Sequence, residues 1–408
     1  MSSANKKTQL VVIFITVFIY LLGFGIIIPI LPILSRDFGA TAFETGLLMS
    51  IYSLAQFLFA PFWGRLSDRK GRKPILLFCL LGEGLSYIIF ALSRDLYLLF
   101  LARAMAGFFG GSISTASAYI SDITPQNERS KGMALIGVAF GLGFVFGPTI
   151  GGLLTQLGSQ LSSEPFFNTS FASFFVAGIC GLTFLFGYFK LEESLKEKNI
   201  NHDRKNRFLV IFEKLKIPIV NKLIVIFFLL SFAMSSMEAT LILFMGSKFN
   251  WGVKEVSFGF GYIGLMMIFA QGFLVRRLIP KYGERVVLTI GSICFFSGLG
   301  LIAVADSISF MAICMTLLAL GNGLSSPSVL GSISLLTEST EQGGTMGVTQ
   351  SLSSLGRILG PALGGWLFYK STQTSPFIFS SLLGMISFIV LLSIYSKIPV
   401  KGKHHEPT

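Results

Sequence analysis

Four ionisable side chains interrupt long apolar runs of the chain: Glu83, Arg103, Glu238 and Arg357. A charge at the centre of a membrane-spanning helix costs roughly 2.5–3.5 kcal/mol on insertion scales, so such residues normally face a cavity or one another. A carboxyl removed from water favours its protonated form, whereas a nearby guanidinium favours the charged form. We therefore expect Glu83 or Glu238 to bind and release a proton, with Arg103 and Arg357 as their partners.

A structural interpretation of the same residues stays open, because a static pair such as Glu83 with Arg103 would only fix helix packing. Aromatic and thioether side chains in the apolar runs could line an adaptable pocket for an apolar ligand. For any one of them, packing or lipid contact is the commoner role. These candidate pocket residues are Tyr20, Tyr87, Tyr119, Phe232, Met234 and Met237.

Composition indicates an all-α membrane protein. Of the 408 residues, 52% are hydrophobic and 13% are charged, against about 25% charged in soluble domains. The four cysteines are widely spaced in apolar runs and the three histidines lie in a loop and the tail, so we expect neither a metal nor a cofactor. No phosphate-binding loop and no nucleophile–base constellation occurs, which argues against ATP drive and against an enzyme. The net charge of +12 lies mostly in loops and does not indicate nucleic-acid binding.

About 20 apolar residues cross a bilayer as a helix, and this length predicts twelve transmembrane spans. One long polar break, 191–219, divides them into two six-helix bundles. We predict an N-terminal bundle over 1–190, a cytoplasmic linker over 191–219, and a C-terminal bundle with a short cytoplasmic tail over 220–408. The predicted spans are 10–34, 43–63, 74–93, 96–121, 131–155, 168–190, 220–246, 255–275, 285–305, 308–336, 343–369 and 375–396.

The positive charges orient the spans. With the N-terminus inside, the inner segments hold 25 of the 32 lysines and arginines, so both termini are expected in the cytoplasm. The two halves also repeat, because Gly147-Pro148 in the fifth span recurs as Gly360-Pro361 in the eleventh. Duplicated halves are the layout of many secondary transporters, whose site lies between the halves near the midplane.

The stretch Gly64-Arg65-Leu66-Ser67-Asp68-Arg69-Lys70-Gly71-Arg72-Lys73-Pro74 must turn the chain sharply between the second and third spans. It resembles the signature loop of the major facilitator superfamily. Three further motifs resemble those of the drug:proton antiporters in that superfamily. They are the proline pair in Leu22–Pro32, the motif Arg103–Gly107 in the fourth span, and the antiporter motif Gly137–Pro148 in the fifth.

The resemblance implies a charge relay at the cytoplasmic gate. Asp68 and Arg72 would pair with an acid at the inner end of the fourth span, which is Asp122 here. Surface pairs are worth about 0–1 kcal/mol each, which suits a latch that opens in every cycle. Gly64 and Gly71 would permit the turn and close helix approach. Plain positive-inside orientation is the alternative explanation for the basic residues.

In the antiporter motif, Gly143, Gly147 and Pro148 would allow close packing and a bend of the fifth helix. The resemblance adds a role in preventing leak. The tetracycline-exporter-like branch carries acids in its first, third and ninth spans, where this chain has Tyr20, Ser86 and the region of Cys294. Glu83 lies one turn from Ser86 and is a possible substitute. These replacements disfavour a tetracycline–metal chelate as the substrate.

The resemblance therefore implies a multidrug-type antiporter in a bacterial cytoplasmic membrane. We expect proton-coupled efflux of a small lipophilic or cationic compound by alternating access, with the proton gradient as the driving force. The expected partners are that small molecule, protons and the bilayer, and the expected assembly is a monomer. Two alternatives remain: transport of a nutrient, sugar, siderophore or lipid by symport or uniport, and a non-transporting membrane receptor or scaffold.

Overall fold

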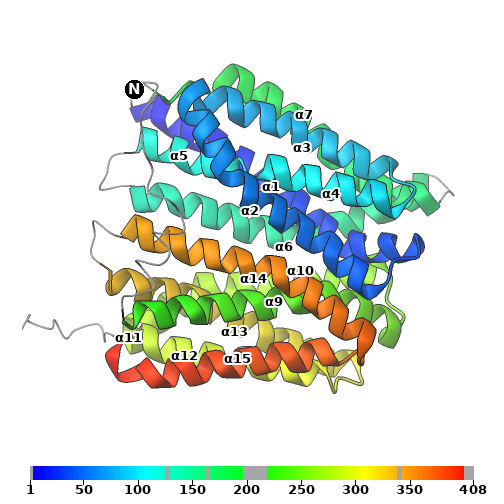
Figure 1. The fold of residues 1–408 in the computed structure, drawn as a ribbon, viewed down its shortest axis with the longest axis vertical. Helices are drawn as coiled ribbons and strands as arrows, with labels where there is room; N and C mark the ends of the chain where they lie inside the picture. The colour runs from blue at the N-terminus through cyan, green and yellow to red at the C-terminus, as the bar shows by residue number, and fades with distance from the viewer. Residues whose placement is uncertain (1–2, 125–128, 162–164, 196–217, 338–341, 399–408) are drawn as a thin grey trace, which may run out of the picture. The chain divides into compact units, whose positions relative to one another are not determined.

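The computed structural model describes residues 3–124, 129–161, 165–195, 218–337 and 342–398, and within these ranges the chain is helical with short turns and has no strand (Figure 1). The first half holds seven helices in the described ranges. They are α1 (Ser3–Asp37), α2 (Ala42–Lys70), α3 (Arg72–Leu92), α4 (Leu96–Gly110), α5 (Ile113–Ile123), α6 (Arg129–Leu161) and α7 (Pro165–Lys190).

The second half follows the same plan from residue 220 onward. Its helices are α9 (Val220–Phe249), α10 (Val253–Phe269), the π-helix η2 (Ala270–Leu274), α11 (Val275–Tyr282), α12 (Glu284–Ile302), α13 (Ile308–Leu335), α14 (Gln342–Lys370), α15 (Ser375–Ile394) and the short 3₁₀ helix η3 (Tyr395–Lys397).

Ten of the described helical segments are long and apolar enough to cross a membrane. In that set α4 continues into α5 as one segment, and α10, η2 and α11 form another. The fifth and eleventh predicted spans coincide with α6 and α14. The α14 segment is the less apolar of these two because glycine, serine and glutamine occupy much of its first half. The helices therefore lie at the twelve predicted positions.

Local capping explains several helix starts. The Thr41 hydroxyl oxygen accepts a hydrogen bond from the backbone N–H of Glu44, and the Glu44 carboxylate accepts one from the backbone N–H of Thr41, which completes a capping box for α2. Asp95 and Ser307 cap α4 and α13 in the same way through one side-chain oxygen.

The turn between α2 and α3 is much tighter than a loop. The sequence predicts that the second span ends near residue 63, whereas α2 continues to Lys70 and α3 begins at Arg72. Gly71 alone makes the turn, with φ of 108°, in a region that favours glycine. Gly283 does the same between α11 and α12 with φ of 79°. The basic stretch thus lies on two helix ends rather than in a loop.

The fourth span is broken where the sequence predicts one helix. Gly110 ends α4 and α5 begins at Ile113. A methyl group on Gly111 would lie 3.0 Å from the backbone nitrogen of Ala60, so the two glycines of the break let the chain approach α2 closely. In the second half, the π-helix Ala270–Leu274 interrupts the eighth span. Such π segments often occur at functional positions.

Several membrane helices leave an apolar face exposed, as expected where lipid replaces water. On α3 this face is formed by Phe78, Leu81, Leu85, Ile88 and Leu92. These positions recur every three or four residues, so they share one side of the helix. Glu83 is fully buried on another face and therefore points into the helix bundle.

The described chain divides into two compact units. One comprises Met1–His202 with Met245–Gly261, and the other comprises Asp203–Phe244 with Tyr262–Thr408. Within the first unit α1 packs on α6 and α7, and α3 packs on α4 and α7. Within the second, α12 packs on α13 and α15. The predicted linker lies partly outside the described residues, since 196–217 are not described.

Candidate functional site

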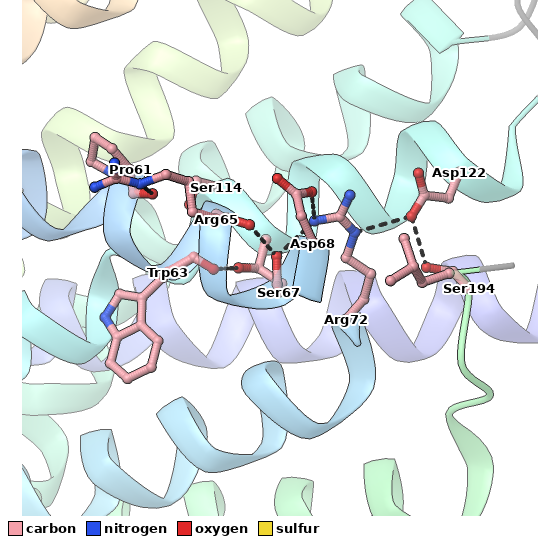
Figure 2. A network of polar contacts seen from close by, with 12 residues as sticks. Pro61, Trp63, Arg65, Ser67, Asp68, Arg72, Ser114, Asp122 and Ser194 are labelled. Atoms are coloured by element: carbon pink, nitrogen blue, oxygen red, sulfur yellow. Dashed lines mark hydrogen bonds and ion pairs between the residues drawn. The ribbon is translucent and has the colours of Figure 1, made fainter. Parts of the chain in front are cut away.

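A network of charges at the α2–α3 turn centres on Arg72 (Figure 2). Its Nη1 lies 2.6 Å from Oδ1 of Asp68, and its Nε lies 3.1 Å from Oδ2 of Asp122. Nη1 also donates to Oγ of Ser67 at 2.7 Å. We call Asp68, Arg72 and Asp122 the Arg72 latch. It joins the last turn of α2, the first residue of α3 and the end of α5.

Burial makes this latch more costly to break than a surface ion pair. The Arg72 side chain is 6% exposed, whereas Asp68 and Asp122 are 19% and 26% exposed. Leaving one partner of a buried pair without its counter-charge costs roughly 3–5 kcal/mol. The sequence-based expectation of about 0–1 kcal/mol per pair applies to exposed charges, so it is too low for Arg72. Opening the latch therefore requires a new partner or water for this guanidinium.

The two glycines of the signature stretch play different parts. A methyl group on Gly71 would lie 2.4 Å from Oε2 of Glu193, in addition to the positive φ. The nearest atom to a methyl group on Gly64 would be Oγ of Ser114 at 3.7 Å, an ordinary contact. The carbonyl of Gly64 accepts a hydrogen bond from Ser67. A side chain is therefore sterically excluded at Gly71 but not at Gly64.

The first half contains a buried polar cluster on three helices. Tyr20 of α1, Glu83 and Tyr87 of α3, and Arg103 of α4 are each no more than 3% exposed. Neither carboxylate oxygen of Glu83 has a hydrogen-bond partner among the described residues, and the same holds for both tyrosine hydroxyls and for Nε of Arg103. Glu83 interacts electrostatically with Arg103, and the hydroxyl of Tyr87 lies next to Glu83. The structure thus brings the expected pair of Glu83 and Arg103 together with two of the candidate pocket residues, Tyr20 and Tyr87.

Aromatic rings hold the Arg103 guanidinium on its other side. Its central carbon lies 4.5 Å from the ring centre of Tyr52 on α2 and 5.9 Å from that of Phe24 on α1. These two rings stack with their centres 4.9 Å apart. A cation over an aromatic face is attracted to it, more strongly where water is excluded. No local motif links Tyr52 or Phe24 to the arginine, so neither residue could be identified from the sequence.

The second half holds its own charged pair. Glu238 on α9 interacts electrostatically with Arg357 on α14, and both residues are partly exposed, unlike the pair in the first half. Arg357 donates from Nη1 to Oγ of Ser353 at 3.2 Å and from Nη2 to Oγ of Ser354 at 3.0 Å. Ser353 in turn lies 2.7 Å from Oγ of Ser231 on α9.

The candidate pocket residues lie in different places. Met234 and Met237 are buried in α9, while Phe232 packs against Phe379 of α15. Tyr119 lies away from Glu83: its hydroxyl is 2.8 Å from Oε1 of Gln9 and 2.7 Å from the carbonyl oxygen of Glu192. Tyr119 therefore belongs with the Arg72 latch and the segment that follows α7, not with the Glu83 cluster.

Small residues bring matching helix pairs together in both halves. Methyl groups on Gly143 and Gly147 of α6 would lie 2.7 Å from backbone atoms of Leu21 and 2.6 Å from those of Gly25 on α1. Pro148 follows within the same helix. In the second half, Gly356, Gly360 and Gly364 of α14 approach α9 in the same way, at Phe232 and Ser236. The repeat seen in the sequence is thus a repeat of helix contacts.

Comparison with known proteins agrees with this architecture. The family model of the Major Facilitator Superfamily matches residues 13–293 and 272–408. A class E tetracycline resistance protein of Escherichia coli is 32% identical over 88% of each chain, and multidrug resistance protein 2 of Bacillus subtilis is 28% identical over 92% of each.

Among solved structures, a bacterial homologue of the human lysosomal transporter Spinster aligns over 100% of both chains with a TM-score of 0.79 at 14% identity. At that identity the likeness speaks for the fold alone. The family match and the tetracycline resistance relative decide the assignment. This chain, an integral multi-pass membrane protein with two six-helix bundles, belongs to the Major Facilitator Superfamily.

Proposed function

We propose that the protein is a proton-coupled exporter of a small lipophilic or cationic compound, working by alternating access. The observation that carries the proposal is the buried Glu83, whose carboxylate oxygens have no hydrogen-bond partner in the described part of the chain. Relatives named for tetracycline and multidrug resistance support efflux as the direction of transport. The proton gradient supplies the driving force.

The chemistry follows from desolvation. Burial disfavours the charged form of a carboxyl, because that form loses its hydration. A guanidinium that moves closer, or water that enters, favours release of that proton. Arg103 lies near Glu83 and is held over Tyr52, so a small shift of α3 against α4 changes the distance between the two charges. Proton binding and helix movement are thereby linked.

The second half also has an acid–base pair within its membrane helices, formed by Glu238 and Arg357. Glu238 and Arg357 are partly exposed, and the Arg357 guanidinium donates to the hydroxyls of Ser353 and Ser354. A partly exposed carboxylate can attract a cationic substrate, while the flexible Met234 can adapt to differently shaped apolar groups. Competition between the substrate cation and a proton for one carboxylate is the simplest form of exchange.

The distribution of positive charge supports a location and a topology for the protein. We place the protein in a bacterial cytoplasmic membrane as a monomer, with both termini on the cytoplasmic side, because the predicted inner segments carry most of the lysines and arginines. The bundles are proposed to comprise 1–190 and 220–408, joined by 191–219. The Arg72 latch then lies on the cytoplasmic side and acts as the gate there.

Purified protein in proteoliposomes with an imposed pH gradient tests the activity. An antiporter moves protons against the direction of an added substrate such as ethidium or tetracycline, whereas a symporter moves them in the same direction. Substrate flux without proton flux indicates a uniporter, and absence of both with a panel of dyes and antibiotics indicates a non-transporting scaffold. Any of these three results, symport, uniport or no transport, contradicts the proposal.

Single carboxyl variants test the mechanism. Glu83→Gln and Glu238→Gln keep the side-chain shape but cannot carry a proton. We expect at least one of them to lose gradient-driven accumulation by tenfold or more, while Asp37→Asn, which changes an exposed carboxyl at the end of α1, leaves it unchanged. Full coupled transport in both variants would exclude both residues as the essential proton carrier.

A further inference from the structure

The segment that follows α7 is fastened to the first half by an unusual set of contacts. Residues 191–195, here called the 191–195 strap, begin with Leu191, which is 2% exposed and packs into the same apolar cluster as Ile13 and Tyr119. The Gln9 side chain donates to the carbonyl of Lys190 at 3.0 Å and accepts from the N–H of Glu192 at 3.0 Å. One amide side chain thus holds the strap backbone on both sides.

Glu193 of the strap supplies the missing cap of α3. Gly71 precedes this helix and has no side chain to satisfy its first N–H groups. The Glu193 carboxylate accepts from the N–H of Arg72 at 2.8 Å and from that of Lys73 at 3.2 Å. A negative charge at a helix N-terminus is also favoured by the helix dipole. The N–H of Leu195 also donates a hydrogen bond to the Glu193 carboxylate, at 3.0 Å.

The strap also contacts the latch itself. Oδ2 of Asp122 accepts hydrogen bonds from Nε of Arg72 at 3.1 Å and from Oγ of Ser194 at 3.0 Å (Figure 2). Arg72 is therefore tied to the strap through its backbone and through a shared acceptor. Any state in which Arg72 leaves Asp122 disturbs both contacts.

We propose that the 191–195 strap is a working part of the Arg72 latch, docking when the latch forms and loosening when it opens, with Glu193 as its positioning residue. The strap begins the connection between the two halves. Its release would lengthen that connection by up to about 17 Å when extended. Latch opening would then also free the connection. The part of this inference that concerns the transport cycle rests on the proposed function.

Hydrogen–deuterium exchange on the full-length protein in nanodiscs tests the cap directly. In Glu193→Ala, the amides of Arg72 and Lys73 should exchange about fivefold faster, the size expected for loss of a helix cap. Glu192→Ala removes the neighbouring exposed carboxylate but keeps Glu193, which accepts from these amides, and should leave their exchange unchanged. Glu193→Gln keeps an acceptor oxygen without the charge and should fall between the two. Unchanged exchange in Glu193→Ala would overturn the proposal.

Coupling of strap and latch needs a reciprocal measurement. Asp122→Asn weakens the latch from the far side, so the strap amides of Glu192 and Leu195 should exchange several-fold faster although neither bonds to Asp122. If these amides exchange at the wild-type rate, Glu193 is only a static cap of α3, and the proposed coupling between strap and latch is wrong.

Transport completes the test. In a working latch, Glu193→Ala should slow substrate efflux several-fold with little change in the concentration for half-maximal rate, and Glu193→Gln should restore part of the rate. Faster exchange with unaltered efflux would again overturn the proposal. Failure of proton coupling in the wild-type protein, with the exchange results as expected, would remove the proposed function and leave the link between strap and latch standing.

Discussion

At the scale of single residues, Arg72 shows how one guanidinium can join three helix ends. Its planar fork reaches Asp68 and Ser67 from Nη1 and Asp122 from Nε. A lysine ammonium is a point charge on a flexible stem and cannot reproduce that fork. The geometry, and not the charge alone, therefore accounts for arginine at this position.

Arg72→Lys should consequently weaken the protein although it keeps the charge. We expect a loss of roughly 1–3 kcal/mol in stability, the range for lost hydrogen bonds to charged groups, and a strong fall in efflux. Thermal unfolding in detergent and a transport assay measure the two effects. Arg65→Lys is the matched control, because exposed Arg65 bonds only to the carbonyl of Pro61 within its own helix in the described structure. Equal behaviour of the two variants would contradict the role given to Arg72.

At the scale of helices, packing depends on places where no side chain fits. The α1–α6 contact at Gly25 and Gly147 and the α9–α14 contact at Ser236 and Gly360 bring backbones together closely. Small residues at such contacts are the usual basis of helix association in membranes. The same device in both halves explains why the glycine–proline motif recurs.

Alanine at these glycines should therefore be costly. A methyl group on Gly147 meets backbone atoms of α1 at 2.6 Å, and one on Gly360 meets backbone of α9 at 2.9 Å. Because backbone cannot yield as a flexible side chain can, we expect a loss of roughly 1–3 kcal/mol for each variant. Gly178→Ala on α7, where nothing lies within 4 Å, is the control and should be neutral or slightly stabilising. Comparable melting temperatures for all three variants would contradict the packing account.

The helices could be predicted because apolar length is a local signal. The resemblance of the signature stretch to that of the superfamily named Asp68, Arg72 and Asp122 as the members of the latch. The role of Glu193 could not be predicted, since it caps α3 from 121 residues further along the chain. The continuation of α2 to Lys70 escaped notice because a helix can extend past the apolar run that defines a span.

At the scale of the whole molecule, the two halves share a helix plan but differ in their charges. The first half buries Glu83 and Arg103 fully, and the second leaves Glu238 and Arg357 partly exposed. Gly71 and Gly283 make the same turn, yet Arg72 follows the first and Glu284 follows the second. The repeat thus supplies the scaffold, while the differences divide the proposed tasks of proton binding and substrate binding between the halves.

The central claim is that the buried carboxyl of Glu83 carries the coupled proton, and the variant Glu83→Gln tests it most directly. Reconstituted in proteoliposomes, this variant should still exchange labelled substrate for unlabelled substrate at equilibrium, because exchange needs no net proton transfer and Glu238 is kept. It should show no substrate-dependent proton flux under an imposed pH gradient. Proton flux at the wild-type rate without the Glu83 carboxyl would contradict the account.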